Sequence, residues 1–132
     1  MVHTYINPMF DYNAKALQQT ITSTLGPVAF EREVTYKNMF GGVMSYTYGR
    51  PFASLSNAGI ALKLNKDGID DLIKAGGYPL RYKPSDPPSK SYTIIPKPLT
   101  MAGGSDLEFW LLKSMDHAKT LPLPKKRKPT GK

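Results

Sequence analysis

The sequence predicts an α+β fold in which an antiparallel sheet is combined with helices placed before, between and after the strands. Short β-branched and aromatic segments, joined by turns of a few residues, fill about residues 34–63, as in an antiparallel meander. Segments with apolar residues at helical spacing occupy residues 14–25, 67–76 and 106–120. The expected order is therefore helix, strand meander, short helix, one or two strands, and a last helix.

The first helix is expected to follow Asn13, because an asparagine side chain can accept a hydrogen bond from a free N–H of the first turn. Apolar residues then recur at steps of three and four, at Ala14, Leu17, Ile21 and Leu25. Gly26-Pro27 ends this helix, since glycine tolerates the left-handed cap and proline cannot continue the backbone hydrogen bonds. Residues 1–12 are aromatic and irregular, so we place the domain at residues 13–121.

A glycine pair, Gly41-Gly42, separates two strand-like segments, VTYKNMF and VMSYTY. A phosphate-binding loop would need such glycines at a strand end followed directly by a helix, whereas here a strand follows. The two faces of that strand alternate, with Val43, Ser45 and Thr47 on one and Met44, Tyr46 and Tyr48 on the other. We therefore interpret the glycine pair as a hairpin turn or bulge between two strands.

In the C-terminal half, Asp67 is expected to cap a short helix that ends at Gly76-Gly77. The apolar face of this helix would consist of Ile69, Leu72 and Ile73. A proline-rich loop, the strand SYTIIP and a linker at residues 98–105 follow. Asp106 is then expected to cap a last helix that runs to about Thr120. Its apolar residues are Leu107, Trp110, Leu111, Met115, Ala118 and Leu121.

The composition indicates one domain with a basic tail. The chain has 132 residues, of which 40% are hydrophobic, and no cysteine, which excludes disulfides, thiolate metal sites and cysteine catalysis. Of the net charge of +8, five positive charges lie in the last eight residues, KKRKPTGK, which leaves +3 for residues 1–124. Residues 122–132 are low in apolar content, so we expect a disordered tail.

No signal peptide and no membrane span is recognisable in the sequence. We therefore expect a cytoplasmic protein that makes no membrane contact. If the host is eukaryotic, the tail sequence PKKRKP would be a nuclear localisation signal and the protein would be nuclear.

Several short motifs, in order and at plausible spacing, resemble the N-terminal domain of the TfoX/Sxy family. They are Met39-Phe40-Gly41-Gly42, then Gly49, Phe52 and Ala53 in a turn and strand, the pair Leu62-Lys63, and a helix that ends in Gly76. The similarity extends from about residue 17 to residue 121. It implies the order α-β-β-β-α-β-β-α, similar to type III secretion chaperones, with PLRYKP and SYTIIP paired in a second hairpin.

The TfoX/Sxy family is known from bacterial regulators of competence for DNA uptake. Full-length regulators of this kind carry a second, helical C-terminal domain, and here the globular part is followed by a basic tail. The resemblance thus implies a small regulatory or adaptor domain that contacts a protein partner or forms a homodimer. The expected contact surface is Phe109 and Leu112, which lie off the main apolar stripe of the last helix.

No catalytic or metal-binding constellation is recognisable. The two histidines, His3 and His117, are far apart in the sequence, whereas a metal site needs three or four convergent ligands. Asp70 and Asp71 are neighbours on a helix and do not face each other as a carboxylate dyad. No serine lies in the G-x-S-x-G context of a hydrolase nucleophile. We therefore expect no enzyme activity, no cofactor and no metal.

A second hypothesis is direct nucleic-acid binding, because the segment YPLRYKPSDPPSKSY interleaves tyrosines, on which bases stack, with cations that follow phosphates. The candidate contacts are Tyr78, Arg81, Tyr82, Lys83, Lys90 and Tyr92, with Lys125, Lys126, Arg127 and Lys128 in the tail. The alternative is that the tyrosines pack across strands and the lysines are solvated, which the lack of an RNP-like signature favours. Under the first hypothesis, the tail adds only weak, salt-sensitive affinity for nucleic acid.

Overall fold

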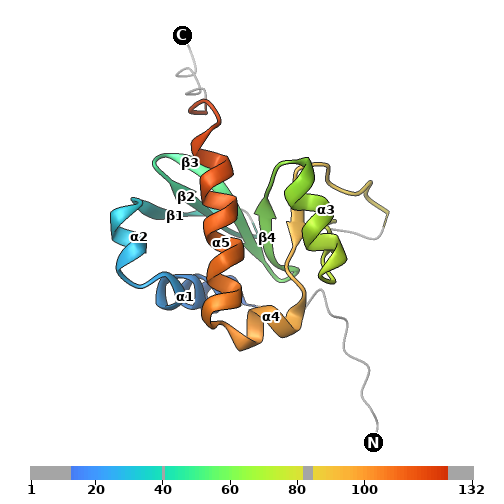
Figure 1. Ribbon diagram of the computed structural model, residues 1–132, viewed down its shortest axis with the longest axis horizontal. Helices are drawn as coiled ribbons and strands as arrows, with labels where there is room; N and C mark the ends of the chain where they lie inside the picture. The colour runs from blue at the N-terminus through green and yellow to red at the C-terminus, as the bar shows by residue number, and fades with distance from the viewer. Residues whose placement is uncertain (1–12, 40, 82–84, 125–132) are drawn as a thin grey trace, which may run out of the picture.

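The computed structural model of the protein describes residues 13–39, 41–81 and 85–124 and confirms the α+β class (Figure 1). Within these ranges six strands form one antiparallel sheet in the order β1-β2-β3-β4-β6-β5. The elements are α1 (Ala14–Leu25), α2 (Pro27–Glu31), β1 (Val34–Met39), β2 (Gly42–Thr47), β3 (Arg50–Ser56), β4 (Gly59–Lys63), α3 (Lys66–Lys74), β5 (Tyr78–Pro79), β6 (Tyr92–Ile94), α4 (Lys97–Ala102) and α5 (Gly104–Lys119).

The element order differs from the expected one in two respects. The first group of strands has four members rather than the three that the family resemblance implies, and two short helices, α2 and α4, are added. A second hairpin forms with SYTIIP as expected, but its first strand is β5, Tyr78–Pro79, so among the described residues only Pro79 of the predicted segment PLRYKP lies in a strand. Of the predicted end segments, residues 1–12 and 125–132 lie outside the described residues.

The predicted start and end of α1 are confirmed. The Asn13 side chain accepts a hydrogen bond from the Ala16 N–H at 3.1 Å, and Gly26 ends the helix with a φ of +54°. Pro27 then begins a further short helix, α2, which was not predicted. Proline suits a first helical position because its fixed φ is already helical and no backbone N–H is needed there.

The prediction that Gly41-Gly42 joins two strands is also confirmed, because β1 ends before the pair and β2 begins at Gly42. Gly41 has a φ of +82°, a conformation that favours glycine. Gly42 lies against the backbone of β3, where a Cβ atom would meet the carbonyl oxygen of Leu55. The pair therefore allows both the turn and the close approach of β2 to β3.

Two predicted helix starts are wrong. The N-cap of α3 is Asn65, whose side chain accepts from the Gly68 N–H at 2.8 Å, and Asp67 lies in the first turn. The last helix begins at Gly104, so Asp106 likewise lies in the first turn rather than at the cap. In both helices the acid is near the N-terminus because the helix dipole favours negative charge there, without acting as the cap.

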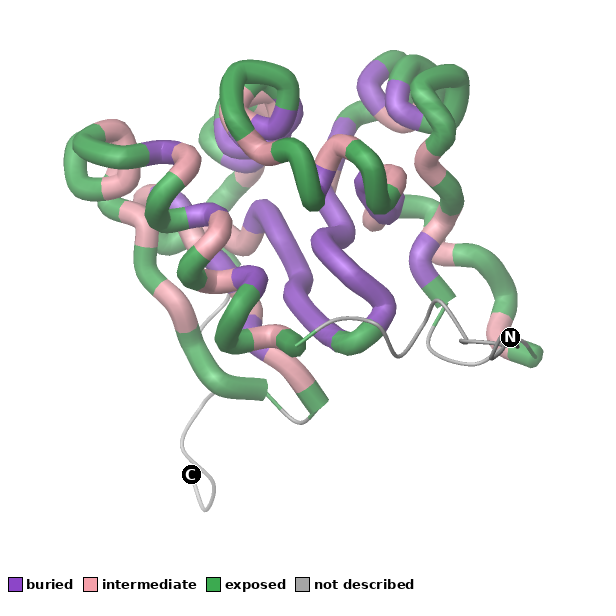
Figure 2. Tube along the Cα trace, turned by 90° about the horizontal axis from the view of Figure 1, so that it is seen from below, coloured by how far each residue is buried: buried purple, intermediate pink, exposed green. Residues whose placement is uncertain are grey.

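The core lies between one face of the sheet and the helices that cover it (Figures 1 and 2). On β2 the predicted alternation is confirmed, with Val43, Ser45 and Thr47 buried. The core side chains include Phe52, Leu55, Ile60 and Leu62 of the sheet, Leu17, Ile21 and Leu25 of α1, Leu72 of α3, and Leu107, Leu111 and Met115 of α5. Ile73, predicted to share the apolar face of α3, is 42% exposed.

A smaller apolar cluster lies on the opposite face of the sheet. It consists of Ala58, Ala61, Leu80 and Ile94, with half-buried Tyr92 beside it. Register places Ala61 opposite Ile94 on neighbouring strands, so their side chains project to the same face. This second cluster ties the β5–β6 hairpin to β4.

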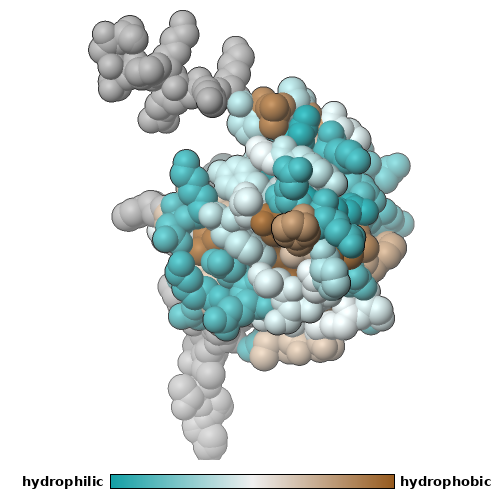
Figure 3. Space-filling model, turned by 90° about the vertical axis from the view of Figure 1, so that its left-hand side faces the viewer, coloured by the Kyte–Doolittle hydropathy of each residue, from teal (hydrophilic) through white to brown (hydrophobic). Residues whose placement is uncertain are grey.

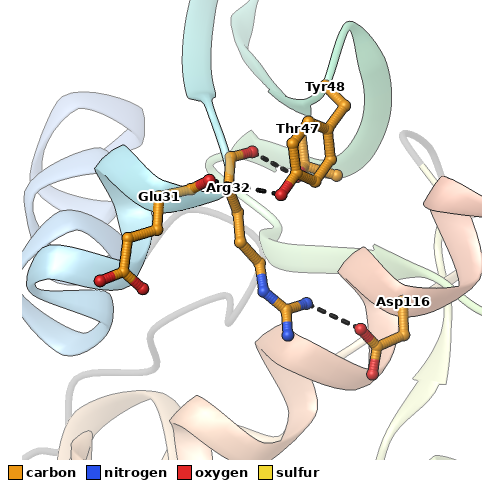
Figure 4. Close-up of polar contacts among 5 residues, drawn as sticks. All are labelled: Glu31, Arg32, Thr47, Tyr48 and Asp116. Atoms are coloured by element: carbon orange, nitrogen blue, oxygen red, sulfur yellow. Dashed lines mark hydrogen bonds and ion pairs between the residues drawn. The ribbon is translucent and has the colours of Figure 1, made fainter.

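Polar contacts fix the turn between α2 and β1 (Figure 4). The Arg32 guanidinium donates to the Asp116 carboxylate of α5 at 2.7 Å, and the Arg32 carbonyl accepts from the Thr47 hydroxyl at 2.7 Å. The Tyr48 hydroxyl donates to the Glu31 carbonyl at 3.3 Å. These bonds connect α2 with β2 and with α5, and Asp116 of α5 lies 84 residues from Arg32 in the sequence.

Candidate functional site

Most residues of the family motif have structural roles. Phe52, Ala53 and Leu62 are buried in the core, and Gly49 and Gly76 adopt the positive φ angles that favour glycine in turns. Phe40 lies outside the described residues. These residues account for the resemblance through the fold, so they do not by themselves identify a site.

The start of the motif borders a groove on the sheet face that points away from α1 and α5. The groove has a volume of about 600 Å³. Its lining comes from the end of β1, β2, β3 and the turns that follow β1 and β3, and it includes Met39, Met44, Ser54 and Asn57. No charged side chain lines it among the described residues. It is therefore suited to apolar contact rather than to chemistry.

The structure describes four of the tyrosines and cations proposed as nucleic-acid contacts in the second hairpin, whereas Tyr82 and Lys83 lie outside the described residues. Tyr78, Arg81 and Lys90 are exposed, and Tyr92 is half-buried. The tail cations Lys125, Lys126, Arg127 and Lys128 also lie outside the described residues.

Tyr92 packs across the sheet. Its hydroxyl is 4.0 Å from the Met44 sulfur of β2, and the Lys63 ammonium of β4 lies 5.8 Å from its ring centroid. Lys63 is the register partner of Tyr92 on the neighbouring strand. For Tyr92 these contacts favour cross-strand packing over a free stacking surface.

Lys63 also lines a second cleft, which lies at the end of the sheet where α5 terminates. This basic cleft has a volume of about 440 Å³. Its lining residues are Arg50, Pro51, Lys63, Leu64, Lys90, Ser91, His117, Leu121, Pro122 and Pro124. The fold thus brings together cations from β3, β4 and the β5–β6 connection with a histidine of α5.

Arg50 is fixed in this basic cleft by the backbone. Its Nε donates to the Leu121 carbonyl at 2.7 Å, and its Nη1 donates to the Tyr48 carbonyl at 2.9 Å. Leu121 directly follows the C-terminal turn of α5, where carbonyl oxygens lack helical partners. The guanidinium therefore satisfies the Leu121 carbonyl and holds a positive charge in the lining of the cleft.

His117 contributes the imidazole of the basic cleft. Burial and the nearby Lys63 charge lower the pKa of His117 below its ordinary value of 6.5. The imidazole is therefore mainly neutral at neutral pH, so that it offers one donor and one acceptor nitrogen. The sequence suggested His117 only as a metal ligand to be excluded, and no local pattern links it to Arg50.

The proposed partner residues on α5 have different surroundings. Phe109 is 55% exposed, and its ring stands edge-on to Trp110 with centroids 5.2 Å apart. Leu112 is half-buried and packs partly against the core. Phe109 is therefore the more accessible of the two.

Two further findings concern the part of the chain that the structure describes. No group of three His, Cys, Asp or Glu side chains there could hold a metal ion. None of the helices there combines the length and the apolar character needed to cross a membrane.

One of the three comparisons with known proteins identifies a family. The family model described as the TfoX N-terminal domain matches residues 27–118, which is more than half of the chain. The comparisons with curated proteins and with solved structures give no significant match. On the family match, together with the α+β fold and the glycine joint between β1 and β2, this chain belongs to the TfoX N-terminal domain family.

Proposed function

We propose that this domain is a non-enzymatic regulatory or adaptor module of the cytoplasm that acts by non-covalent contact with a protein partner. By analogy with the competence regulators of its family, the process it serves would be the control of transcription. The observation that carries the proposal is exposed aromatic surface on α5 and α2.

The α5 part of this surface is a stripe along one side of the helix. Phe109, Leu112 and Asp116 follow at steps of three and four, so they lie on the same side. At the C-terminal end of the stripe, Asp116 is bound to Arg32, the residue that follows α2. That short helix carries Phe30, which is 88% exposed.

Such a surface suits protein contact better than solvent. The side of the molecule on which α2 lies is mostly hydrophilic, with a few separate apolar patches (Figure 3). Burying one phenylalanine side chain contributes about 1.5–3 kcal/mol, and aromatic anchors within a polar surround are typical of interface hot spots. We take a second copy of this chain as the partner to be tested first.

The test is the oligomeric state of the full chain across a wide range of protein concentration, by light scattering after size exclusion. We expect a concentration-dependent dimer that is lost in the Phe30→Ser, Phe109→Ser double variant. The Ile73→Ser variant is the matched control, because Ile73 is also an exposed apolar side chain but lies on α3. A chain that stays monomeric at the highest concentration contradicts the homodimer.

Nucleic-acid binding is a second candidate function. The observation that favours it is the basic cleft, where Arg50, Lys63 and Lys90 lie together. The tail cations would add affinity that is weak and falls steeply with salt. The neutral tail variant Lys125→Gln, Lys126→Gln, Arg127→Gln, Lys128→Gln in the full chain tests this part, and we expect it to weaken binding to any oligonucleotide regardless of sequence.

A further inference from the structure

We propose that the basic cleft is a phosphate-binding site whose ligand is the backbone of a nucleic acid. The charge would come from Arg50, Lys63 and Lys90, and His117 would supply a further hydrogen-bonding edge. The inference deepens the nucleic-acid candidate above and does not depend on the partner surface at Phe109.

The charge of the cleft is unbalanced. Three cationic side chains line it, and no carboxylate belongs to its described lining residues. The nearest acid along α5, Asp116, is already bound to Arg32. Like charges that share a small, partly enclosed space repel one another, and an anion placed among them removes that repulsion.

Helix stabilisation explains only part of this arrangement. A cation near the C-terminus of α5 is favoured by the helix dipole, and Arg50 fills that role with its bonds to Leu121 and Tyr48. Among the described residues the second terminal nitrogen of Arg50, Nη2, has no hydrogen-bond partner. Lys90 is exposed on the β5–β6 connection, without a hydrogen bond or ion pair in the described part of the chain. Its presence in the same cleft is therefore not accounted for by stabilisation of α5.

His117 suits a site that already holds three positive charges before a ligand binds. Its neutral form avoids adding a fourth positive charge to the three cations around it. When a phosphate binds beside it, the anion favours the protonated imidazole, which then donates a charge-assisted hydrogen bond. The imidazole thus reports directly on occupancy of the cleft.

The nature of the ligand follows from the sequence that comes after the last lining residue of the cleft. Pro124 lines it, and the next four residues of the sequence are Lys125, Lys126, Arg127 and Lys128. A ligand with one phosphate would engage the cleft alone, whereas a polyanion with regularly spaced phosphates can engage the cleft and the cations that follow. A volume of about 440 Å³ is also within the range of pockets that hold small organic ligands, so it exceeds the need of one phosphate group.

The first experiment measures binding of the full chain to a fluorescent single-stranded oligothymidylate by anisotropy, at several salt concentrations. We compare the Lys63→Gln, Lys90→Gln variant with Lys37→Gln, Lys74→Gln, which removes the same charge from exposed positions outside the cleft. We expect the cleft variant to bind at least about fivefold more weakly than the control variant. The slope of log affinity against log salt should be smaller in magnitude by about 1.4 for the cleft variant than for the control variant, because two phosphate contacts are lost and each contact of a single strand contributes about 0.7.

Three outcomes would contradict the cleft as a nucleic-acid site. Equal losses in the two double variants would overturn the cleft, because net charge alone would then explain binding. If only the neutral tail variant loses binding, the tail affinity stands and the cleft inference fails. If inorganic phosphate or a phosphoserine peptide binds the cleft but the oligonucleotide does not, the proposed ligand is wrong.

A local readout is available because the chain has only two histidines, His3 and His117. The His3→Gln variant assigns their imidazole resonances. We expect the oligonucleotide to shift the His117 resonance at fixed pH in the wild type and much less in Lys63→Gln, Lys90→Gln. A His117 resonance that does not move while anisotropy reports binding would place the ligand elsewhere.

Discussion

Ser114 shows how one side chain repairs an irregularity of the sheet. Between β2 and β3 the register shifts: Ser45 pairs with Ala53 and Tyr46 with Pro51, so that Phe52 has no residue opposite it. The Ser114 hydroxyl lies 2.7 Å from the Phe52 carbonyl oxygen and 2.8 Å from that of Lys63. Because Ser114 is fully buried, no water can take its place without rearrangement.

We therefore expect Ser114→Ala to lower the free energy of unfolding by about 1–3 kcal/mol, the usual cost of leaving a buried polar group unsatisfied. Urea unfolding measures the change. Ser105→Ala is the matched control, because Ser105 is exposed on the same helix and its loss should cost no more than about 0.5 kcal/mol. Equal effects of the two substitutions would show that the hydrogen bonds of Ser114 do not matter for stability.

His117 makes stability depend on pH in a defined direction. Burial and Lys63 lower the pKa of His117 in the folded chain, whereas in the unfolded chain it returns to about 6.5. Between these two values the unfolded chain binds more protons, so stability falls as pH falls through that window. Well above pH 6.5 the imidazole is neutral in both states and this contribution no longer changes.

The difference in unfolding free energy between wild type and His117→Gln should thus be constant well above pH 6.5 and should change as the pH falls through 6.5 and below it. In parallel, Lys63→Gln should raise the pKa of His117, because it removes one of the two causes of the shift. An NMR titration of the imidazole measures that pKa. If Lys63→Gln leaves the pKa unchanged, the lysine is not close enough to His117 to share a ligand with it.

At the scale of the helix, apolar spacing predicted the three longer helices well, whereas residue type predicted their N-caps less well. Most of the predicted apolar stripes of α1 and α5 is buried, since spacing of three and four defines one face, whereas Ala14 and Leu121 are half-buried and Leu121 lies beyond the end of α5. The start of α3 was misplaced because aspartate and asparagine are both good N-caps, so residue type alone does not separate Asp67 from Asn65. In the structure the helix begins at Lys66, and the Asn65 side chain accepts the hydrogen bond from the Gly68 N–H. The short helices α2 and α4 were missed since five or six residues are too few to show a periodic pattern.

The assignment of the cap can be tested directly. Asn65→Ala should destabilise the protein by about 1 kcal/mol, because the Gly68 N–H loses its acceptor. Asp67→Ala removes only a favourable charge near the helix N-terminus, so we expect a loss of about 0.3–1 kcal/mol at low salt that vanishes at high salt. Thermal unfolding at two salt concentrations distinguishes the two effects. A salt-sensitive loss for Asn65→Ala would contradict the cap.

For the whole molecule, the sequence predicted the fold far better than the candidate site. Strand and helix patterns are local, and they sufficed for the sheet, the glycine joint and the helices that form the core. The basic cleft draws Arg50, Lys63, Lys90 and His117 from four parts of the chain. Only the sheet order, in which β6 inserts between β4 and β5, places Lys90 beside Lys63. No spacing along the chain contains that information.

The two apolar clusters predict how the molecule loses its structure. Leu111 of α5 is fully buried in the main core, which joins α1, α3, α5 and the sheet, whereas Leu80 belongs to the small cluster behind the β5–β6 hairpin. We expect Leu111→Ala to cost about 3–5 kcal/mol and to speed hydrogen exchange throughout α1, β3 and α5, because the main core opens as one unit. Leu80→Ala should cost at most about 2 kcal/mol and should speed exchange mainly at the amides of β5 and β6, since few contacts couple that hairpin to the helices. Exchange measured by mass spectrometry on both variants decides the matter. If Leu80→Ala instead speeds exchange in α1 and α5 as well, the two faces of the sheet form one cooperative unit. A ligand in the basic cleft, which is lined by residues of both β4 and α5, would then stabilise the entire domain rather than one end of it.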